Sequence, residues 1–285
     1  ARLPGHARRP ALTPRSVAMR VAVVALGVAA ASQHVLRGDS LAVLLLLALA
    51  GALLAAPLAR YAAAWFGFAL LRAGANDLGL PERGRAVAAL DRWLGGGLTP
   101  TERLQQAFYQ AGATGWLDYA AIWVHTSYYV VPHLAAAALW WRDRTQSAPA
   151  TTPFGLYWRG VLALMALGLL LYALVPTAPP WLQATREDDM RVYRITRATN
   201  AATQDPEQEL LYTYFTDPNP VAALPSLHQA FTVLLAWALW RERRGLGVLG
   251  AVYAAAMGFT LVYLGEHYLV DVLAGAALAG LVIAG

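Results

Sequence analysis

Residues 260–275 read TLVYLGEHYLVDVLAG, and within this stretch one apolar segment ends and another begins. Residues 246–264 are almost entirely apolar, and so are residues 269–285. Between them lies a short polar break that contains His267, and Asp271 follows four residues later. Both segments approach the roughly 20 residues that a membrane-spanning helix needs. The stretch therefore predicts a helical hairpin in a bilayer, with ionisable residues at its turn.

The same apolar pattern recurs along the rest of the chain. Only 14% of the 285 residues are charged, whereas a soluble domain carries about 25%. A soluble helical bundle would need polar helix faces, and these segments lack them. We therefore expect an all-α polytopic transmembrane bundle of seven or eight spans, the third being short. The further segments are residues 17–36, 41–57, 60–73, 117–141, 159–175 and 226–240.

We treat residues 1–285 as a single membrane domain with three parts. Residues 1–75 hold the N-terminal spans, residues 76–115 form a polar segment, and residues 116–285 form the catalytic bundle. Apolar residues in the polar segment recur at spacings of three and four, which predicts amphipathic helices on the membrane surface. The polar loop at residues 182–224 is too long for a simple connection, so we expect it to be functional.

The positive charges predict the orientation of the chain. All 22 basic residues are arginine, and the formal net charge is +5. Arginines precede the first span and follow the spans at 117–141 and 226–240, and cytoplasmic flanks are enriched in such residues. We expect both termini in the cytoplasm of a bacterial-type plasma membrane, with loop 182–224 outside. No basic patch interleaved with aromatic residues indicates nucleic-acid binding.

Three ionisable residues lie at the predicted outer membrane edge, where such residues are costly and usually functional. His267 and Asp271 are four residues apart and would share one helix face. The carboxylate can then accept a ring N–H, fix the tautomer and leave the other ring nitrogen free to attack. His228 lies in the sequence PSLH, where Pro225 suits a first helical turn whose free N–H groups favour anions.

Two other interpretations of these residues compete with that of an enzyme site in which a histidine attacks a bound anionic group. Two histidines and a carboxylate could bind a metal, although the PSLH context favours phosphate, and the absence of cysteine excludes thiolate ligands. A transporter would place acid and base residues near the midplane, whereas here they gather at one edge. We therefore expect an enzyme that needs neither metal nor cofactor.

The two motifs resemble signature blocks of the type 2 phosphatidic acid phosphatase superfamily, the lipid phosphate phosphatases. Residues 260–275 are similar to the third block of that family and PSLH, residues 225–228, to the second. The resemblance covers roughly residues 117–275. It implies a helical bundle with a six-helix core and a membrane-embedded histidine that becomes transiently phosphorylated.

The resemblance also implies a role for each motif residue. His267 would be the nucleophile, Asp271 would orient it, and His228 would protonate the leaving group. Ser226 would hold a phosphate oxygen. We expect further contacts to substrate from residues near the same membrane edge and in the outer loop: His125, Tyr128, Thr177, Trp181, Arg191 and Arg194.

The chain departs from the phosphatase pattern at its cations. Phosphatases of this superfamily carry Arg six residues before the nucleophile, where this chain has Leu261, and Thr260 replaces their usual Ser. PTAPPW at residues 176–181 stands where a Lys and an Arg-Pro pair are expected. These changes resemble the branch containing inositol phosphorylceramide synthase, and residues 267–272 are also similar to the sphingomyelin synthases.

A phosphate monoester dianion needs strong cationic clamping, and a diester with one negative charge needs less. The resemblance therefore favours a lipid head-group phosphotransferase that uses a phospholipid donor and a lipid or polyol acceptor. The alternative is a lipid phosphate phosphatase acting on phosphatidic acid or an isoprenyl phosphate.

Overall fold

The computed structural model describes residues 57–75, 78–143, 151–198 and 219–285. The first two predicted spans fall outside these residues, except for Pro57. The chain divides into two compact units with a boundary after Leu70. All candidate site residues belong to the second unit, residues 71–285, and the rest of the description concerns that unit.

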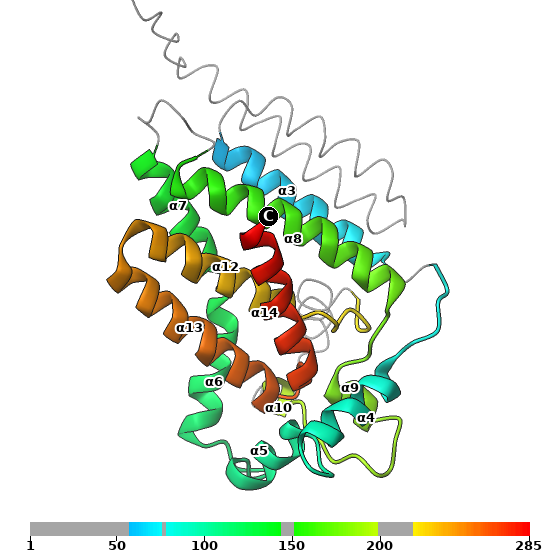
Figure 1. Ribbon diagram of the computed structural model, residues 1–285. Coiled ribbons are helices and arrows are strands. Elements are labelled where there is room, and N and C mark those ends of the chain that lie inside the picture. Colours follow the sequence, from blue (N-terminus) through cyan, green and yellow to red (C-terminus); the bar gives the residue numbers. More distant parts are fainter. Residues whose placement is uncertain (1–56, 76–77, 144–150, 199–218) are drawn as a thin grey trace, which may run out of the picture. The chain divides into compact units, whose positions relative to one another are not determined.

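Every regular element in the described residues is a helix, and these residues contain no strand. This confirms the predicted all-helical class for the described part of the chain. The helices are α3 (Pro57–Ala73), α4 (Gly84–Leu94), α5 (Pro100–Phe108), α6 (Trp116–Ser127), α7 (Val131–Asp143), α8 (Pro153–Leu174), α9 (Pro180–Ala184), α10 (Ile195–Ala198), α12 (Leu227–Glu242), α13 (Arg244–Tyr263) and α14 (Leu269–Ala284), as labelled in Figure 1.

Among the described residues, two helices are long and apolar enough to cross a membrane. They are α8, with 22 residues and a mean hydropathy of 1.7, and α13, with 20 residues and a mean hydropathy of 1.8. The last helix, α14, is also apolar but has only 16 residues. The total of seven or eight spans stays a prediction.

The structure corrects the predicted continuous span at residues 117–141. The chain forms two helices there, since α6 ends at Ser127 and α7 begins at Val131. Pro132 has no backbone N–H and its ring blocks a preceding helical turn, so one unbroken helix through this point is disfavoured. The break places the turn at residues 128–130 close to the start of α12.

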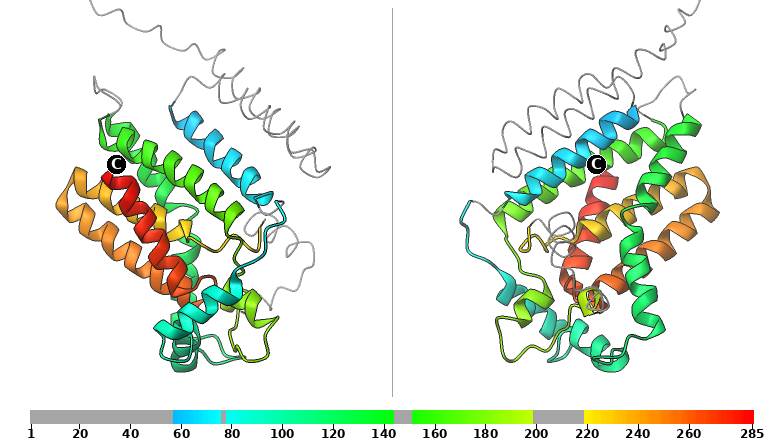
Figure 2. Two further views of the ribbon diagram at one scale, coloured as in Figure 1. Left: turned by 45° about the vertical axis from the view of Figure 1, so that its right-hand side comes forward. Right: turned by 180° about the vertical axis from the view of Figure 1, so that it is seen from behind.

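Helix α12 is the centre of the larger unit and packs against α8, α13 and α14. Figures 1 and 2 show α12 and α13 running side by side. Small residues allow close packing between α8 and α12: a Cβ added at Gly160 would lie 2.7 Å from Leu234, and one at Gly168 would lie 2.5 Å from Leu227. Close approach through small residues is typical of helices packed in membranes.

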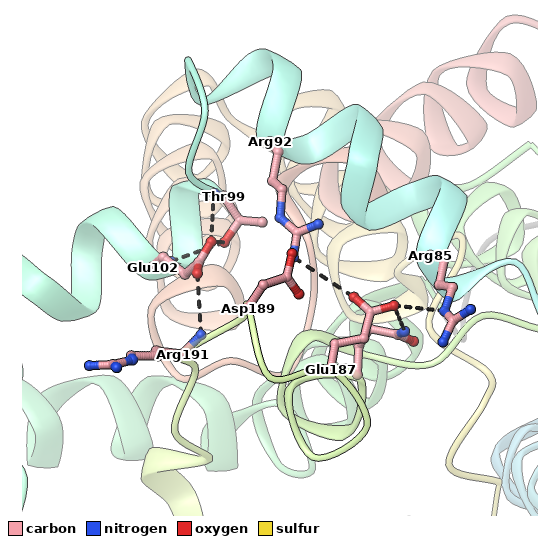
Figure 3. A network of polar contacts seen from close by, with 8 residues as sticks. Arg85, Arg92, Thr99, Glu102, Glu187, Asp189 and Arg191 are labelled. Carbon is pink, nitrogen blue, oxygen red and sulfur yellow. Dashed lines mark hydrogen bonds and ion pairs between the residues drawn. The ribbon is translucent and has the colours of Figure 1, made fainter.

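The predicted amphipathic segment contains helices α4 and α5, and both are held to the loop that follows α9 (Figure 3). Glu187 pairs with Arg85 at 2.8 Å, and Asp189 pairs with Arg92 at 3.3 Å. Glu102 accepts a hydrogen bond from the backbone N–H of Arg191 at 3.2 Å. Glu187 and Asp189 of this loop therefore pair with arginines of α4 rather than with the loop's own arginines.

Candidate active site

A tight turn joins α13 to α14 and carries the predicted nucleophile. Gly265 has φ of +81°, and a Cβ at that position would lie 2.7 Å from the carbonyl oxygen of Tyr193. Glycine meets both demands because it lacks a side chain. The turn ends α13 at Tyr263, and α14 begins only at Leu269. His267 therefore lies in the turn, which corrects the prediction that it shares a helix with Asp271.

His267 and Asp271 nevertheless meet. The Nδ1 atom of His267 lies 3.4 Å from Oδ2 of Asp271, and the same oxygen accepts a hydrogen bond from the backbone N–H of Tyr268 at 2.9 Å. The histidine is 6% exposed and the aspartate is fully buried. The distance to the ring is longer than a typical hydrogen bond, and such contacts commonly tighten when substrate binds. Asp271 therefore contacts the ring of His267 through Nδ1 and not through Nε2.

The start of α12 is held against the start of α14. The backbone N–H of Ser226 donates to the carbonyl oxygen of Asp271 at 2.9 Å. Gly275 makes this approach possible, because a Cβ there would lie 2.1 Å from the carbonyl oxygen of Ser226. The two helix starts therefore meet, and they bring the second motif beside the first.

As a result, His228 faces His267, with 5.9 Å between their ring centroids. The ring centroid of His125 in α6 lies 5.4 Å from that of His228, and the ring centroid of Tyr128 lies 4.2 Å from it. The Nε2 atom of His228 is buried and has no hydrogen-bond partner among the described residues. A ring nitrogen of His228 is thus left for a ligand.

One polar pocket contains all three histidines. Its wall is formed by Arg72, by helices α6 and α12, by the turn after α13 and by the segments around α9 and before α12. Its lining residues are Arg72, His125, Tyr129, Pro179, Trp181, Arg194, Asn219, Pro220, Ala222, Ala223, His228, Glu266 and His267.

An ion pair forms part of the pocket wall. Arg194 contacts both carboxylate oxygens of Glu266, at 3.0 and 3.1 Å, and Thr196 donates to Glu266 at 2.7 Å. The guanidinium carbon of Arg194 lies 4.2 Å from the ring centroid of Trp181. Burial raises the pKa of Glu266, but the charge of Arg194 and these hydrogen bonds lower it more, so the pKa is below its ordinary value. The carboxylate is therefore ionised and the pair is neutral overall.

The predicted substrate-binding residues divide into two groups. His125, Trp181 and Arg194 line the pocket, and Tyr128 packs on His228. The other three, Ser226, Thr177 and Arg191, do not line it.

These three have other positions. Ser226 is fully buried, and its hydroxyl accepts a long contact of 3.4 Å from the N–H of Gln229 at the start of α12. Thr177 is also fully buried, and its hydroxyl donates to the carbonyl oxygen of Val175. The side chain of Arg191 is exposed and points away from the network in Figure 3.

Sequence reasoning missed three polar lining residues: Arg72, Asn219 and Glu266. A continuous helix through His267 would turn Glu266 away from the site, so the sequence alone predicts no role for it. The left-handed Gly265 was the available signal against that helix, since a glycine followed by polar residues is typical of a helix C-terminus. Arg72 lies far from both motifs in sequence and carried no local signal.

A second hollow lies beside the segment at residues 224–225. Its lining is entirely apolar and comes from that segment, the end of α8 and the middle of α14: Leu171, Val175, Leu224, Pro225, Ala274, Ala277, Leu278 and Leu281. No group of three or more His, Asp or Glu residues in the described ranges has the arrangement of a metal site.

Comparison with known families gave one match. A family model described as the PAP2 superfamily matches residues 85–285. No curated protein and no solved structure matches the chain. The matched residues include both histidine motifs and helices α4 to α14, but not α3.

Proposed function

The chain belongs to the PAP2 superfamily, and we propose that it transfers a phosphorylated head group from a phospholipid to an alcohol through a covalent phosphohistidine at His267. Membership of the superfamily supports phosphatase-type or phosphotransferase-type chemistry on phosphate esters. The two apolar helices and the family together point to a membrane protein.

The proposed reaction has two half-reactions. In the first, Nε2 of His267 attacks the phosphorus of the donor, and the bond from phosphorus to the lipid alcohol oxygen breaks. His228 donates a proton to that oxygen, and Asp271 stabilises the positive charge that develops on the His267 ring. In the second, His228 takes the proton from the acceptor hydroxyl, whose oxygen attacks phosphorus and releases His267.

The observation that carries this proposal is the arrangement of His228 opposite His267 in one pocket. A buried imidazole nitrogen without a partner is costly unless a ligand satisfies it. His228 is therefore suited to exchange a proton with the leaving and attacking oxygens. The apolar hollow beside Pro225 supports a lipid donor, because it offers a place for an acyl chain next to the second motif.

The charges near His267 favour a diester over a monoester. Leu261, which occupies the usual arginine position, is fully buried in the core and offers no charge. Arg194 is already neutralised by Glu266. A monoester dianion would find little compensation here, whereas a diester carries one charge fewer. The alternative, a lipid phosphate phosphatase, gains support only if Arg194 leaves Glu266 to bind substrate.

The test compares two activities of the purified enzyme in lipid vesicles. Head-group exchange from diester phospholipids to labelled inositol or diacylglycerol is followed by mass spectrometry, and phosphate release is followed from phosphatidic acid and an isoprenyl phosphate. We expect exchange to be faster. Arg194→Gln is compared with Arg159→Gln, an exposed arginine in the first turns of α8. Fast monoester hydrolysis that collapses only in Arg194→Gln would establish the phosphatase instead.

We also propose that the site faces the outer side of a plasma membrane and that both termini are cytoplasmic. The chain has no cysteine, so a single Asp188→Cys change gives one thiol, at an exposed position of the loop after α9. A membrane-impermeant maleimide should label this thiol in intact cells. Labelling that appears only after the cells are broken would reverse the proposed orientation.

A further inference from the structure

The pocket needs a positive charge that can reach a bound phosphate, and the motif positions do not provide one. Leu261 is apolar and fully buried. Arg194 has both carboxylate oxygens of Glu266 as partners, and both side chains are at least 87% buried. Moving Arg194 to a substrate would leave Glu266 as an unpaired buried charge, which is strongly unfavourable. The cation must therefore come from elsewhere in the pocket wall.

Arg72, in the last turn of α3, lines the same pocket as the three histidines. Its side chain is partly buried, and no carboxylate among the described residues pairs with it. Its guanidinium carbon lies 5.9 Å from the ring centroid of Tyr172, and its charge is close enough to interact with His228. We propose that Arg72 binds the phosphate of the substrate and takes the place of the missing motif cations.

The main chain around Arg72 is fixed in a way that suits this role. The side-chain amide of Asn219 donates to the carbonyl oxygen of Arg72 at 2.9 Å, and its own oxygen accepts from the N–H of Val221 at 3.1 Å. Thr177 in turn donates its N–H to the carbonyl oxygen of Val221 at 2.7 Å and accepts from Ala223 at 3.2 Å. The end of α3 is thus tied to the pocket wall, while the guanidinium remains available.

The inference rests on the proposed function and deepens it. Because the pair of Arg194 and Glu266 is neutral, Arg72 supplies one net positive charge, which matches the single negative charge of a phosphodiester. A planar guanidinium can also bind two phosphate oxygens at once. Arg72 lies outside the residues 85–285 that the family model matches, so this cation belongs to the N-terminal part of the chain.

The experiment measures binding separately from turnover. Orthovanadate, which mimics the trigonal phosphoryl group, is titrated into the purified protein by calorimetry. Arg72→Gln and Arg72→Met should raise the dissociation constant by about tenfold to a hundredfold, as expected for the loss of a charge-assisted contact. Arg159→Gln, at the far end of α8, should leave it unchanged. With a diester lipid, the Arg72 variants should show a similar loss in kcat/KM.

A second measurement uses the unmodified protein and does not depend on how the variants fold. Phenylglyoxal modifies accessible arginines, and peptide mass spectrometry locates the modification. Orthovanadate should protect Arg72 and leave Arg159 equally reactive. Vanadate affinity within twofold of wild type in a folded Arg72 variant, or no protection of Arg72, would overturn the inference. Vanadate binding that depends on Arg72 without any lipid turnover would instead reject the proposed function.

Discussion

Replacing Asp271 by asparagine separates its catalytic role from its structural one. Oδ2 of Asp271 serves two groups, the Nδ1 atom of His267 at 3.4 Å and the backbone N–H of Tyr268 at 2.9 Å. Asparagine retains one oxygen that can accept from Tyr268, so the first turn of α14 stays capped. It has no negative charge to stabilise a positive His267 ring. Its amide N–H can also donate to Nδ1, which favours the His267 tautomer that carries its proton on Nε2 and cannot attack.

The expected effects on rate and stability therefore differ. A comparable exchange at a catalytic His–Asp pair lowers kcat by about four orders of magnitude, equivalent to about 5.4 kcal/mol of activation free energy. We expect Asp271→Asn to lose about three to four orders of magnitude in turnover. Its stability should change by less than about 1 kcal/mol, since the cap is kept. Asp271→Ala should lose similar activity and also about 1 kcal/mol or more of stability, because it removes the cap.

The assay measures single-turnover release of the lipid alcohol from a diester lipid, together with thermal unfolding of the same samples in detergent. Asp271→Ala is the matched control for structural damage. The reasoning fails if Asp271→Asn keeps more than a tenth of wild-type turnover, or if it unfolds as readily as Asp271→Ala. The first result would remove the aspartate from the chemistry, and the second would make it a structural residue.

Three further predictions concern the nucleophile, metals and pH. His267→Ala should abolish turnover with unchanged circular dichroism, and near-normal turnover would reject the phosphohistidine. Activity should survive exhaustive chelation and be inhibited by vanadate, whereas zinc-restored activity after chelation would indicate a metal enzyme. Burial raises the pKa of Asp91 to about 6, against the opposing hydrogen bond from Val270. Because this folded-state pKa exceeds the ordinary 3.8, the folded protein binds the proton of Asp91 more tightly than the unfolded chain does. The resulting stabilisation of the fold is full below about pH 4 and is lost as the pH rises towards 6. The melting temperature of wild type relative to Asp91→Asn should fall over that range, and parallel curves would contradict the raised pKa.

The sequence predicted the helical class and most helix positions because the apolar segments are long and their ends are marked by arginine, proline or glycine. Thus α8 and α13 were expected at 159–175 and 246–264 and are found at Pro153–Leu174 and Arg244–Tyr263. The division of 117–141 was missed because hydropathy averages over a turn as short as residues 128–130. Apolar character shows that a segment is buried, but it does not show that its backbone is continuous.

For the site, spacing predicted which motif residues meet but not which other residues join them. His267 and Asp271 are four residues apart and do meet, although through a turn and a helix cap rather than along one helix face. Arg72 and Asn219 enter the pocket from segments 147 residues apart. No local pattern encodes such a contact, because it depends on how helices pack.

The distribution of satisfied and unsatisfied polar groups indicates where the substrate sits. Oδ2 of Asp271 has His267 and the N–H of Tyr268, whereas its Oδ1 is buried without a partner among the described residues, and Glu266 has Arg194 and Thr196. These carboxylates gain nothing from a bound anion, so they do not mark its position. Nε2 of His228, by contrast, is buried without a hydrogen-bond partner, and the partly buried Arg72 has no carboxylate partner among the described residues. A buried ring nitrogen without a partner is costly, and a phosphate between these two groups would contact both. It would accept a hydrogen bond from the guanidinium, exchange a proton with His228, and present its phosphorus to His267.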